Sequence, residues 1–228
     1  MADPARPGLT VRPAAPGDVP AIAGIFGRAF EDYRRGLGVS PEALARLWSA
    51  SLEARVASTT VAALPDGRVA GFVVAALPGV KERYGGWRES RRQMRVWRQE
   101  LGAAAFWRLP LLFIPMGLAY AKRQARKDEV YVSLIAVEPE LQGRGVGQAL
   151  LAAVDDQARA AGAAAILLHT ASTNARARAA YARAGYELVC TARAPWLGPA
   201  RIPAYLAYRK PLRPDPTPRL AAFARQQR

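Results

Sequence analysis

Three glycines stand close together in the segment LQGRGVGQALL (Leu141–Leu151), directly before a run with helical character. The first turn of a helix leaves backbone N–H groups without partners, and the helix dipole adds positive potential there. Glycines let the backbone approach phosphate oxygens closely, because no Cβ stands in the way. The residue types and their spacing therefore predict a phosphate site. The side chain of Arg144 either adds a charge to that site or points into solvent.

Two common nucleotide sites do not fit this glycine cluster. The nucleoside-triphosphate loop requires a Lys and a hydroxyl residue after its last glycine, and both are missing here. The dinucleotide fingerprint has the spacing G-x-G-x-x-G at the front of a doubly wound sheet, whereas this chain has G-x-G-x-G about two thirds of the way along. It also has no acidic residue placed to bind a ribose after the next strand. A glycine-rich turn that binds no ligand remains the alternative.

The glycine cluster and a motif further along together resemble the acetyl-CoA-binding region of the GNAT superfamily of acyl-CoA-dependent N-acyltransferases. In that superfamily, Gln/Arg-x-x-Gly-x-Gly/Ala is followed by an Asn and then by Ala, Tyr and a Gly-aromatic pair at +3, +7 and +11/+12. The matching residues are Gln142, Gly145 and Gly147, then Asn174, Ala177, Tyr181 and Gly185-Tyr186. The resemblance covers about residues 9–212. The closing strands and the insertion are further similar to the puromycin N-acetyltransferase-like subgroup.

The resemblance implies that the chain binds acetyl-CoA as its acyl donor. The strand Val130–Val137 would separate from its neighbour and leave backbone groups free for the pantetheine arm, the glycine loop would hold the pyrophosphate, and Asn174 would hydrogen-bond the pantetheine. For Asn174 an N-cap role is the alternative, and it is compatible with ligand binding. The cofactor-binding residues implied in this way are Leu134, Ile135, Ala136, Val137, Gln142, Gly143, Arg144, Gly145, Val146, Gly147, Asn174 and Tyr181.

The resemblance also implies direct attack of an amine on the thioester, with Tyr181 protonating the leaving thiolate. A phenol is a suitable positioned proton donor. The alternative for Tyr181 is an ordinary helix residue that packs on the sheet. Backbone groups of residues 135–137 would stabilise the oxyanion. No Ser or Cys nucleophile is required, and we expect Cys190 to be a small buried residue in a closing strand.

The general base is less well defined by the sequence. His169 is the single histidine and stands at the end of the strand after the loop helix, where many relatives have a carboxylate. A histidine that titrates near neutral pH suits a general base, although a polar residue that merely ends a strand is the plainer interpretation. Further candidates are Glu129, Glu138 and Asp128. Tyr131 and Ser133 are expected on one face of the strand, where they would carry a water relay.

The elements that must position these residues follow from periodicity and turn signals. We expect strands and helices in the order strand, helices, hairpin, insertion, strand, helix, strand, helix and two strands. Asp18 is expected to cap the first helix and Ser40 another, and Asp66-Gly67 predicts the hairpin turn. The predicted fold class is α/β (α+β), a GNAT-like mixed and mostly antiparallel central sheet with a splay between two parallel strands and helices on both faces.

The expected domain organisation is a tail at residues 1–8, one domain at 9–212 and a Pro/Arg-rich tail at 213–228. A mainly helical insertion is expected at about 78–128. Its apolar run Ala103–Ala121 is interrupted by Arg108, Pro110 and Pro115 and is too short to span a bilayer. We expect a broken, buried helix there, with a membrane-surface contact or a substrate wall as alternatives. Aromatic residues of the first helices, the insertion and the closing strands suit either an apolar or aromatic amine or core packing: Phe30, Tyr33, Trp87, Trp97, Phe106, Trp107, Trp196 and Tyr205.

The composition sets broader limits. The net charge is +15, but most basic residues are Arg, they are spread along the chain, and no nucleic-acid-reading motif is present. One cysteine excludes an intrachain disulfide framework, and the N-terminal segment lacks the apolar stretch of a secretion signal. We therefore expect a cytoplasmic protein, without a metal, a transmembrane segment or nucleic-acid binding, and either monomeric or homodimeric.

The leading hypothesis is an N-acetyltransferase that moves an acetyl group from acetyl-CoA to a primary amine of a small molecule. The long insertion favours a closed acceptor site. Acetylation of a protein N-terminus or lysine is a second hypothesis, and it would require an open groove. A non-catalytic acyl-CoA-binding regulatory module is a third, and a basic nucleic-acid binder is a fourth.

Overall fold

One mixed β-sheet organises the part of the chain that the structure describes, which in this computed structural model is residues 8–78, 87–106, 108–194 and 200–213. Its strand order is β1-β2-β3-β4-β5-β7-β6. Every neighbouring pair is antiparallel except β4 and β5, which are parallel. The strands are β1 (Thr10–Pro13), β2 (Thr59–Ala63), β3 (Val69–Ala76), β4 (Glu129–Val137), β5 (Ala165–Ala171), β6 (Glu187–Arg193) and β7 (Ala204–Pro211). The predicted mixed sheet with one parallel pair is confirmed.

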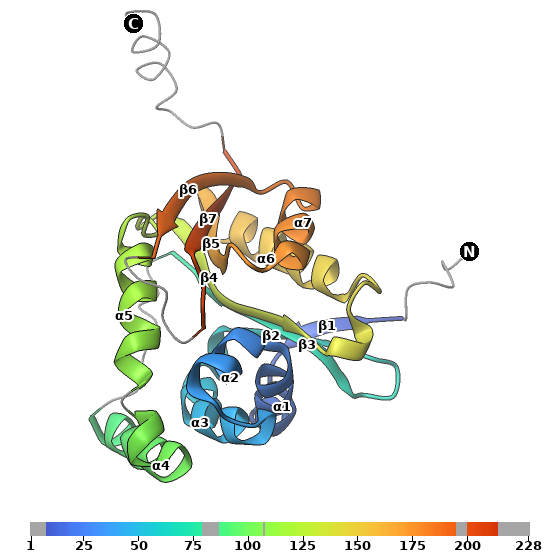
Figure 1. Cartoon of the computed structure of the whole chain (residues 1–228). Coiled ribbons are helices and arrows are strands. Elements are labelled where there is room, and N and C mark those ends of the chain that lie inside the picture. Colours follow the sequence, from blue (N-terminus) through green and yellow to red (C-terminus); the bar gives the residue numbers. More distant parts are fainter. Residues whose placement is uncertain (1–7, 79–86, 107, 195–199, 214–228) are drawn as a thin grey trace, which may run out of the picture.

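Helices cover both faces of this sheet (Figure 1). They are α1 (Val19–Ala29), α2 (Glu31–Leu37), α3 (Pro41–Glu53), α4 (Trp87–Phe106), α5 (Arg108–Ala121), α6 (Val146–Ala160) and α7 (Ala175–Arg183), with short 3-10 turns at Pro16–Asp18, Val56–Ser58 and Pro139–Leu141. The first three helices share one apolar core with α4 and α5. The other core lies beneath α6 and α7 on the opposite face. The expectation of helices on both faces is therefore confirmed.

Several local signals act as the sequence predicts. The Ser40 hydroxyl accepts a hydrogen bond from the Ala43 backbone at 3.2 Å and caps α3. Gly67 has φ +85° in the turn of the β2–β3 hairpin. The expectation that Asp18 caps the first helix is wrong, because its carboxylate makes no cap hydrogen bond to α1. It accepts instead from the Ala15 backbone and from Arg12, so it fastens β1 to the turn before the helix.

The helices α4 and α5 stand between β3 and β4 in the sequence, within the predicted helical insertion. One side of α5 packs against α2 and β7. Leu111, Ile114 and Leu118 point outward, with 47%, 49% and 54% of their surfaces exposed. The expectation of a buried helix is therefore wrong for this stripe, which lies on the side of α5 away from its contacts with α2, α4, β6 and β7. Among the described helices, none has both the length and the apolar character to cross a bilayer.

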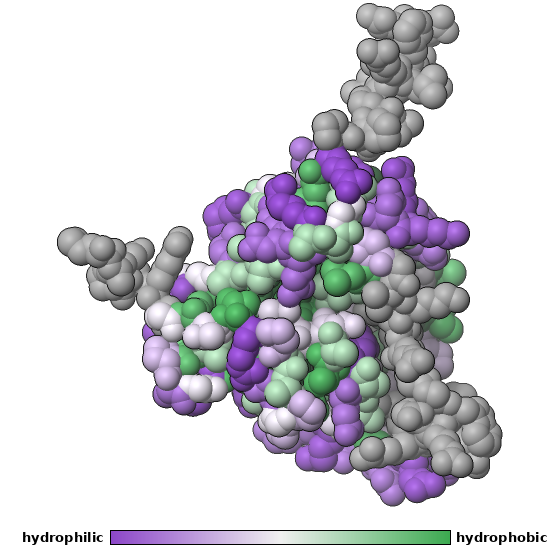
Figure 2. Space-filling view, turned by 180° about the vertical axis from the view of Figure 1, so that it is seen from behind, coloured by the Kyte–Doolittle hydropathy of each residue, from purple (hydrophilic) through white to green (hydrophobic). Residues whose placement is uncertain are grey.

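The other face of the molecule is mixed in character. Figure 2 shows hydrophobic residues in several separate groups among hydrophilic ones, with many hydrophilic side chains toward the top of the view.

Cys190 is half-buried in β6, at a register shift against β7, and is less buried than expected because β6 is the outermost strand. The predicted tails fall almost wholly outside the described residues, at 1–7 and 214–228.

Candidate active site at the fork between two parallel strands

The strands β4 and β5 pair only at their beginnings. Their parallel register runs from Glu129–Ala165 to Val132–Leu168 and then stops. Beyond that point β4 stays paired with β3 as far as Val137, and β5 stays paired with β7 as far as Ala171. The two strands thus form a fork that opens toward their carboxyl ends, as the predicted splay requires. Ladder groups point alternately to the two sides of a strand, so some backbone groups of residues 134–137 face the gap.

A bulge lies where the fork opens. Leu134 is registered with Val74 and Val132 with Ala75, which leaves Ser133 as the extra residue of β4. A bulge interrupts the alternation of side chains. Leu134 therefore packs on the same core as α1–α3, while Ile135 packs on the core beneath α6. The Ser133 hydroxyl lies 3.5 Å from the Val74 carbonyl oxygen. The expectation that Tyr131 and Ser133 share one face assumed a regular strand, whereas Ser133 is the extra residue of a bulge.

The glycine loop connects the end of β4 with α6. Gly143 has φ +83° and Gly145 has φ +86°, a region of backbone conformation that disfavours side chains. Gly145 is the N-cap of α6, and its carbonyl accepts the first helical bond from Ala149 at 3.0 Å. The N–H groups of residues 146–148, between Gly145 and Ala149, consequently have no helical partner. Arg144 is exposed beside them. The loop therefore has the donors and the positive charge that a pyrophosphate would need.

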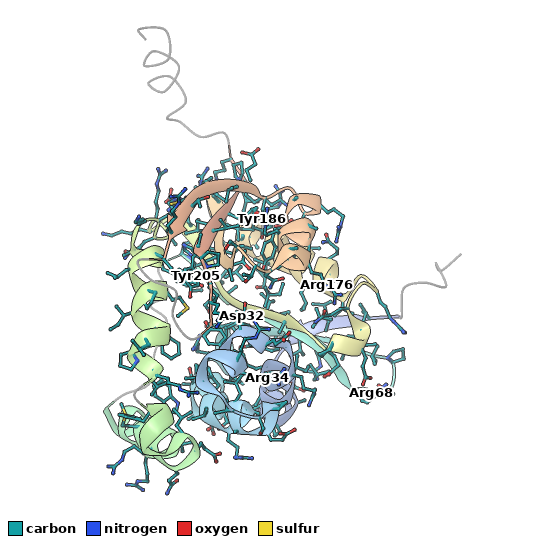
Figure 3. The ribbon with its side chains drawn as sticks, in the orientation of Figure 1. Asp32, Arg34, Arg68, Arg176, Tyr186 and Tyr205 are labelled. Atoms are coloured by element: carbon teal, nitrogen blue, oxygen red, sulfur yellow. The ribbon has the colours of Figure 1, made fainter. Side chains whose placement is uncertain are left out.

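Gln142 joins this loop to the two neighbouring elements. Its side-chain amide donates to the Val137 carbonyl at 3.2 Å, and its oxygen accepts a hydrogen bond from Arg176 of α7. Figure 3 shows Arg176 extending from the start of α7 toward the turn before α6. The match of Gln142 to the family motif thus corresponds to a bridge across the open end of the fork, and Arg176 adds a cation that the motif does not include.

Asn174 and Tyr181 lie on α7, on the α6 side of the sheet. The Asn174 side-chain oxygen accepts from the Ala177 backbone at 3.0 Å, so the cap role is present. An amide that accepts through oxygen can still donate through nitrogen. Tyr181 is 5% exposed, and its ring lies 5.7 Å from Tyr208, which is registered with the last fork-pairing residue of β5. Burial, together with Tyr208, raises the pKa of Tyr181, so the phenol stays protonated at neutral pH.

His169 is the first β5 residue beyond the last residue paired with β4. Its ring stacks on Tyr120 of α5 at 4.2 Å and meets the edge of Tyr131 at 5.7 Å. Within the described part of the chain, neither ring nitrogen has a well-formed hydrogen bond, and a weaker contact with the Arg123 backbone partly opposes the effect of burial on the pKa of the ring. Burial lowers the pKa of His169 to about 4, so the ring is neutral at pH 7. The histidine is thus a neutral ring at the point where the fork opens, and a neutral imidazole offers one nitrogen as a hydrogen-bond acceptor.

His169 and Tyr181 lie on opposite faces of the sheet. His169 contacts α5, which covers the same face as α1–α3, whereas Tyr181 belongs to the core beneath α6. The Tyr181 hydroxyl is close enough to contribute to the raised pKa of Tyr120, after the larger effects of burial and three other tyrosines. A thioester in the fork would therefore have one of these groups on each side.

Glu129 lies at the closed end of the fork. Its side chain has 0% exposure, with Arg123 and Arg209 each at 2.9 Å. Burial tends to raise the pKa of Glu129, but hydrogen bonds from the Arg126 backbone and from the two guanidinium groups outweigh it and lower the pKa. This carboxylate is a weaker base than usual and its oxygens are already engaged. It precedes the opening by three residues, or about 10 Å along the strand.

The other two carboxylate candidates flank β4 at its two ends. Glu138 follows the end of β4 and forms a two-pronged ion pair with Arg28 of α1 at 2.8 Å. Asp128 is an exposed residue immediately before β4, and its carbonyl accepts from the Ala164 backbone at 2.8 Å. Among the four base candidates from the sequence, His169 combines a place where the fork opens with the absence of an ion pair to a carboxylate or a guanidinium group among the described residues.

Asp32 is a further candidate site residue, and the sequence carries no signal for it. This residue of α2 accepts a hydrogen bond at 3.3 Å from Thr173, in the turn between β5 and α7. In Figure 3, Asp32 extends from the end of α2 nearest the sheet, and Tyr205 lies beyond it on the β7 side. With 141 residues between Asp32 and Thr173, no local pattern in the sequence signals this contact.

The predicted acceptor aromatics divide into two groups. Phe30, Tyr33 and Trp97 belong to a ring cluster around Trp48 and Phe113, and Phe106 packs on the same core. Tyr205 lies 5.6 Å from Tyr120, in an edge-on contact, and so adjoins His169. Trp107, Trp196 and the side chain of Trp87 lie outside the described residues. Among the described side chains, no group of three or more metal-ligating residues was found.

A sheet that opens between parallel strands, beside a glycine-rich helix N-terminus, is the arrangement that the resemblance to acyl-CoA-dependent transferases implies. Residues 25–186, more than two thirds of the chain, match the acetyltransferase (GNAT) family, and the chain belongs to that family. It is accordingly an acetyltransferase, and the family uses acetyl-CoA as the donor. No curated protein matches the sequence.

Solved structures of N-acetyltransferases have the same fold. The ribosomal-protein-S18-alanine N-acetyltransferase of Escherichia coli is 18% identical over 92% of this chain and 97% of its own, with a TM-score of 0.54. A GCN5-related N-acetyltransferase from Kribbella flavida is 20% identical over 90% and 98%, with a TM-score of 0.55. Ard1 from Thermoplasma volcanium is 15% identical over 90% and 99%, with a TM-score of 0.54. Similarity at this level of sequence identity shows that the fold is shared. It does not identify the acceptor on which this chain acts.

Proposed function

We propose that this acetyltransferase moves the acetyl group of acetyl-CoA to a primary amine of a small molecule, by direct attack on the thioester. The observation that carries the proposal is the fork between β4 and β5, with His169 on one face and Tyr181 on the other. A thioester in that gap is accessible to an amine from the α2 and α5 side. Its sulfur would lie toward α7.

The donor would be held by the residues around the open end of β4. The N–H groups of the loop Gly143–Gly147 would donate to the pyrophosphate, with Arg144 and Arg176 beside them. The amide nitrogen of Asn174 would donate to the pantetheine arm. Backbone groups of residues 134–137 that face the gap would bind the arm and the carbonyl oxygen on which negative charge develops.

The two proton transfers follow from the positions of His169 and Tyr181 on opposite faces of the sheet. The neutral amine donates a hydrogen bond to His169 and attacks the thioester carbon, and attack makes the nitrogen much more acidic than a free ammonium. A weak base such as His169 can then accept its proton, while Tyr181 gives a proton to the departing thiolate. The C–N bond forms, the C–S bond breaks, and the proton on His169 returns through solvent to Tyr181.

The arrangement of α5 favours a small acceptor. Tyr120 of this helix stacks on His169, and the helix packs on α2 and β7, so it stands over the acceptor side of β5. A protein acceptor is the second candidate. The Escherichia coli structure of the same fold is that of an enzyme whose acceptor is the alanine of a ribosomal protein.

The test is to mix the purified protein with acetyl-CoA and a panel of small amines and peptides, and to follow free thiol release. We expect amine-dependent release, and a fall in kcat of about 100-fold in Tyr181→Phe with little change in acetyl-CoA affinity. Tyr186→Phe is the matched control, because Tyr186 is also buried and its ring lies 6.0 Å from Tyr181. That variant should keep its rate.

Three outcomes would contradict the proposal. Turnover of peptides alone would assign the protein acceptor instead. Tight CoA binding without turnover of any amine would remove the catalytic role. An equal loss of rate in both phenylalanine variants would show that Tyr181 acts through packing.

A further inference from the structure

Asp32 is an acidic side chain placed near the acceptor side of the fork in a strongly basic protein. Its carboxylate is 30% exposed and has two contacts among the described residues. Thr173 donates to one oxygen at 3.3 Å, and Arg35 lies 3.3 Å from the other. Arg35 approaches Glu31 more closely, at 2.7 Å. Both contacts of Asp32 are long for charge-assisted bonds, so the carboxylate can still accept a stronger donor.

The contact with Thr173 fixes the position of Asp32 relative to the reaction site. Thr173 directly precedes Asn174 and follows the end of β5, the strand that carries His169. The same turn contains the Ser172 hydroxyl, which is buried and has no hydrogen-bond partner within the described residues. The ring nitrogens of His169, in the same stretch of four residues, have only a weak contact with the Arg123 backbone among the described residues. Buried polar atoms without partners are rare in proteins, and a bound molecule is one explanation.

Aromatic side chains surround this region on the α2 and α5 side of the sheet. Tyr205 of β7, Tyr120 of α5 and His169 of β5 form a continuous series, with ring separations of 5.6 and 4.2 Å. Asp32 acts electrostatically on one member of this series, Tyr205, and on the neighbouring Tyr33. Burial first, and then Asp32, raises the pKa of Tyr205 to about 12. The pKa of Tyr33 is also raised, by burial, then Tyr205, then Asp32.

We propose that Asp32 is the anionic anchor of the acceptor, and that the acceptor is a cationic primary amine on an aromatic or flat apolar body. The inference rests on the proposed function and specifies its substrate class. The ammonium group donates to the Asp32 carboxylate, and the body of the molecule packs against Tyr205 and Tyr120. A cation is also attracted to aromatic ring faces. In a chain with a net charge of +15, a local carboxylate is needed to offset the general repulsion of cations.

Asp32 is a positioning residue in this scheme. It binds the protonated acceptor, whose proton is lost to solvent water at the exposed side of the carboxylate. Loss of the positive charge weakens the bond to Asp32 and frees the neutral amine to turn toward His169. The inference therefore predicts an effect on acceptor affinity and little effect on the donor.

The experiment uses the CoA-saturated full chain and three matched ligands. These are 2-phenylethylamine, the uncharged isostere 2-phenylethanol, and butylamine, which has the charge without the ring. Calorimetry measures their Kd values, and thiol release with acetyl-CoA gives kcat and KM for the two amines. Larger aromatic amines extend the series to other sizes.

The variants are Asp32→Asn and the control Glu31→Gln. Glu31 lies on the same helix and pairs with the same arginine, but its side chain is 66% exposed. We expect Asp32→Asn to weaken 2-phenylethylamine binding by about 10–50-fold and to raise KM with a small change in kcat. The preference for the amine over 2-phenylethanol should disappear in this variant. Glu31→Gln should change each value less than about twofold. Asp32→Glu should restore part of the affinity.

The inference would be overturned if Asp32→Asn and Glu31→Gln changed the Kd of 2-phenylethylamine equally. Tight binding of 2-phenylethanol by the unmodified chain would also overturn it. So would a failure of the unmodified chain to bind any aromatic amine. Turnover of amines that does not change in Asp32→Asn would remove the anchor and leave the proposed function intact. Charge-dependent binding without any turnover would remove the proposed function and leave the anchor.

Discussion

At the scale of single residues, the sequence reveals the donor side of the site, which would bind acetyl-CoA. It does not reveal the acceptor side, where Asp32 lies. The glycine loop is recognisable from the positive φ that its residues adopt, whereas Asn174 and Tyr181 are recognisable through their match to the family motif. Asp32 could not be found, because its place depends on the contact of α2 with a turn far along the chain. Glu129 was a reasonable candidate by type, but its engagement with two arginines is a property of the folded sheet.

Gly145 provides a test of the donor site. Its φ of +86° means that Gly145→Asp strains the loop by about 1–2 kcal/mol and adds a negative charge where phosphate is expected. The expected result is loss of the thermal stabilisation that acetyl-CoA gives to the unmodified protein. Gly67→Asp is the control, because Gly67 has φ +85° in the β2–β3 turn. It should lower stability by a similar amount and keep the response to acetyl-CoA. Stabilisation that persists in Gly145→Asp would place the pyrophosphate elsewhere.

His169 makes a pH-dependent contribution to stability. Its folded-state pKa of about 4 lies below the ordinary value of about 6.5, so the unfolded chain binds more protons between these values. Stability should therefore fall as the pH drops from about 6.5 to about 4, by about 1–3 kcal/mol after allowance for the partly exposed ring. Urea unfolding across this range measures the slope, and His169→Gln should flatten it. An unchanged slope in that variant would show that other groups cause the loss.

At the scale of elements, the parallel pair is clamped at one end and open at the other. The clamp is Glu129 of β4 with Arg209 of β7 and Arg123 after α5, so it joins the insertion to both halves of the sheet. The boundaries of most helices and strands could be predicted from periodicity and turn residues. The short α2 was missed, because seven residues give too little periodicity to separate it from α1. The outward stripe on α5 was missed because an apolar run does not indicate which of its faces has neighbours.

The clamp predicts a stability effect for Glu129→Gln. Removing the carboxylate leaves two arginines of 19% and 14% exposure without their shared partner. We expect a loss of about 3 kcal/mol in the free energy of unfolding at pH 7. Urea denaturation measures it, and Glu100→Gln is the control, because Glu100 pairs with an arginine that is 57% exposed. A loss of kcat without loss of stability would instead return Glu129 to the candidate bases.

At the scale of the whole molecule, the charge balance matters for the donor. Acetyl-CoA carries several negative charges and the chain has a net charge of +15, so association should be assisted by the general field as well as by the loop. Raising the ionic strength from about 0.05 to 0.5 M shortens the range of that field well below 10 Å. The Kd for acetyl-CoA should then rise about tenfold. S-acetylpantetheine, which lacks the phosphates, should change little when measured in the same way. An equal salt response of both donors would exclude the general field as the cause.

The position of β7 affects the order in which the molecule can assemble. It follows β5 and β6 in the chain but lies between them in the sheet, so neither has its shared neighbour until β7 is present. A chain still emerging from the ribosome can form the hairpin of β2 and β3 early, since domains gain structure from the N-terminal side during synthesis. The acceptor side of the fork, which includes Tyr205, has to wait for β7. Acetyl-CoA can therefore stabilise the growing chain fully only once this last strand has been inserted.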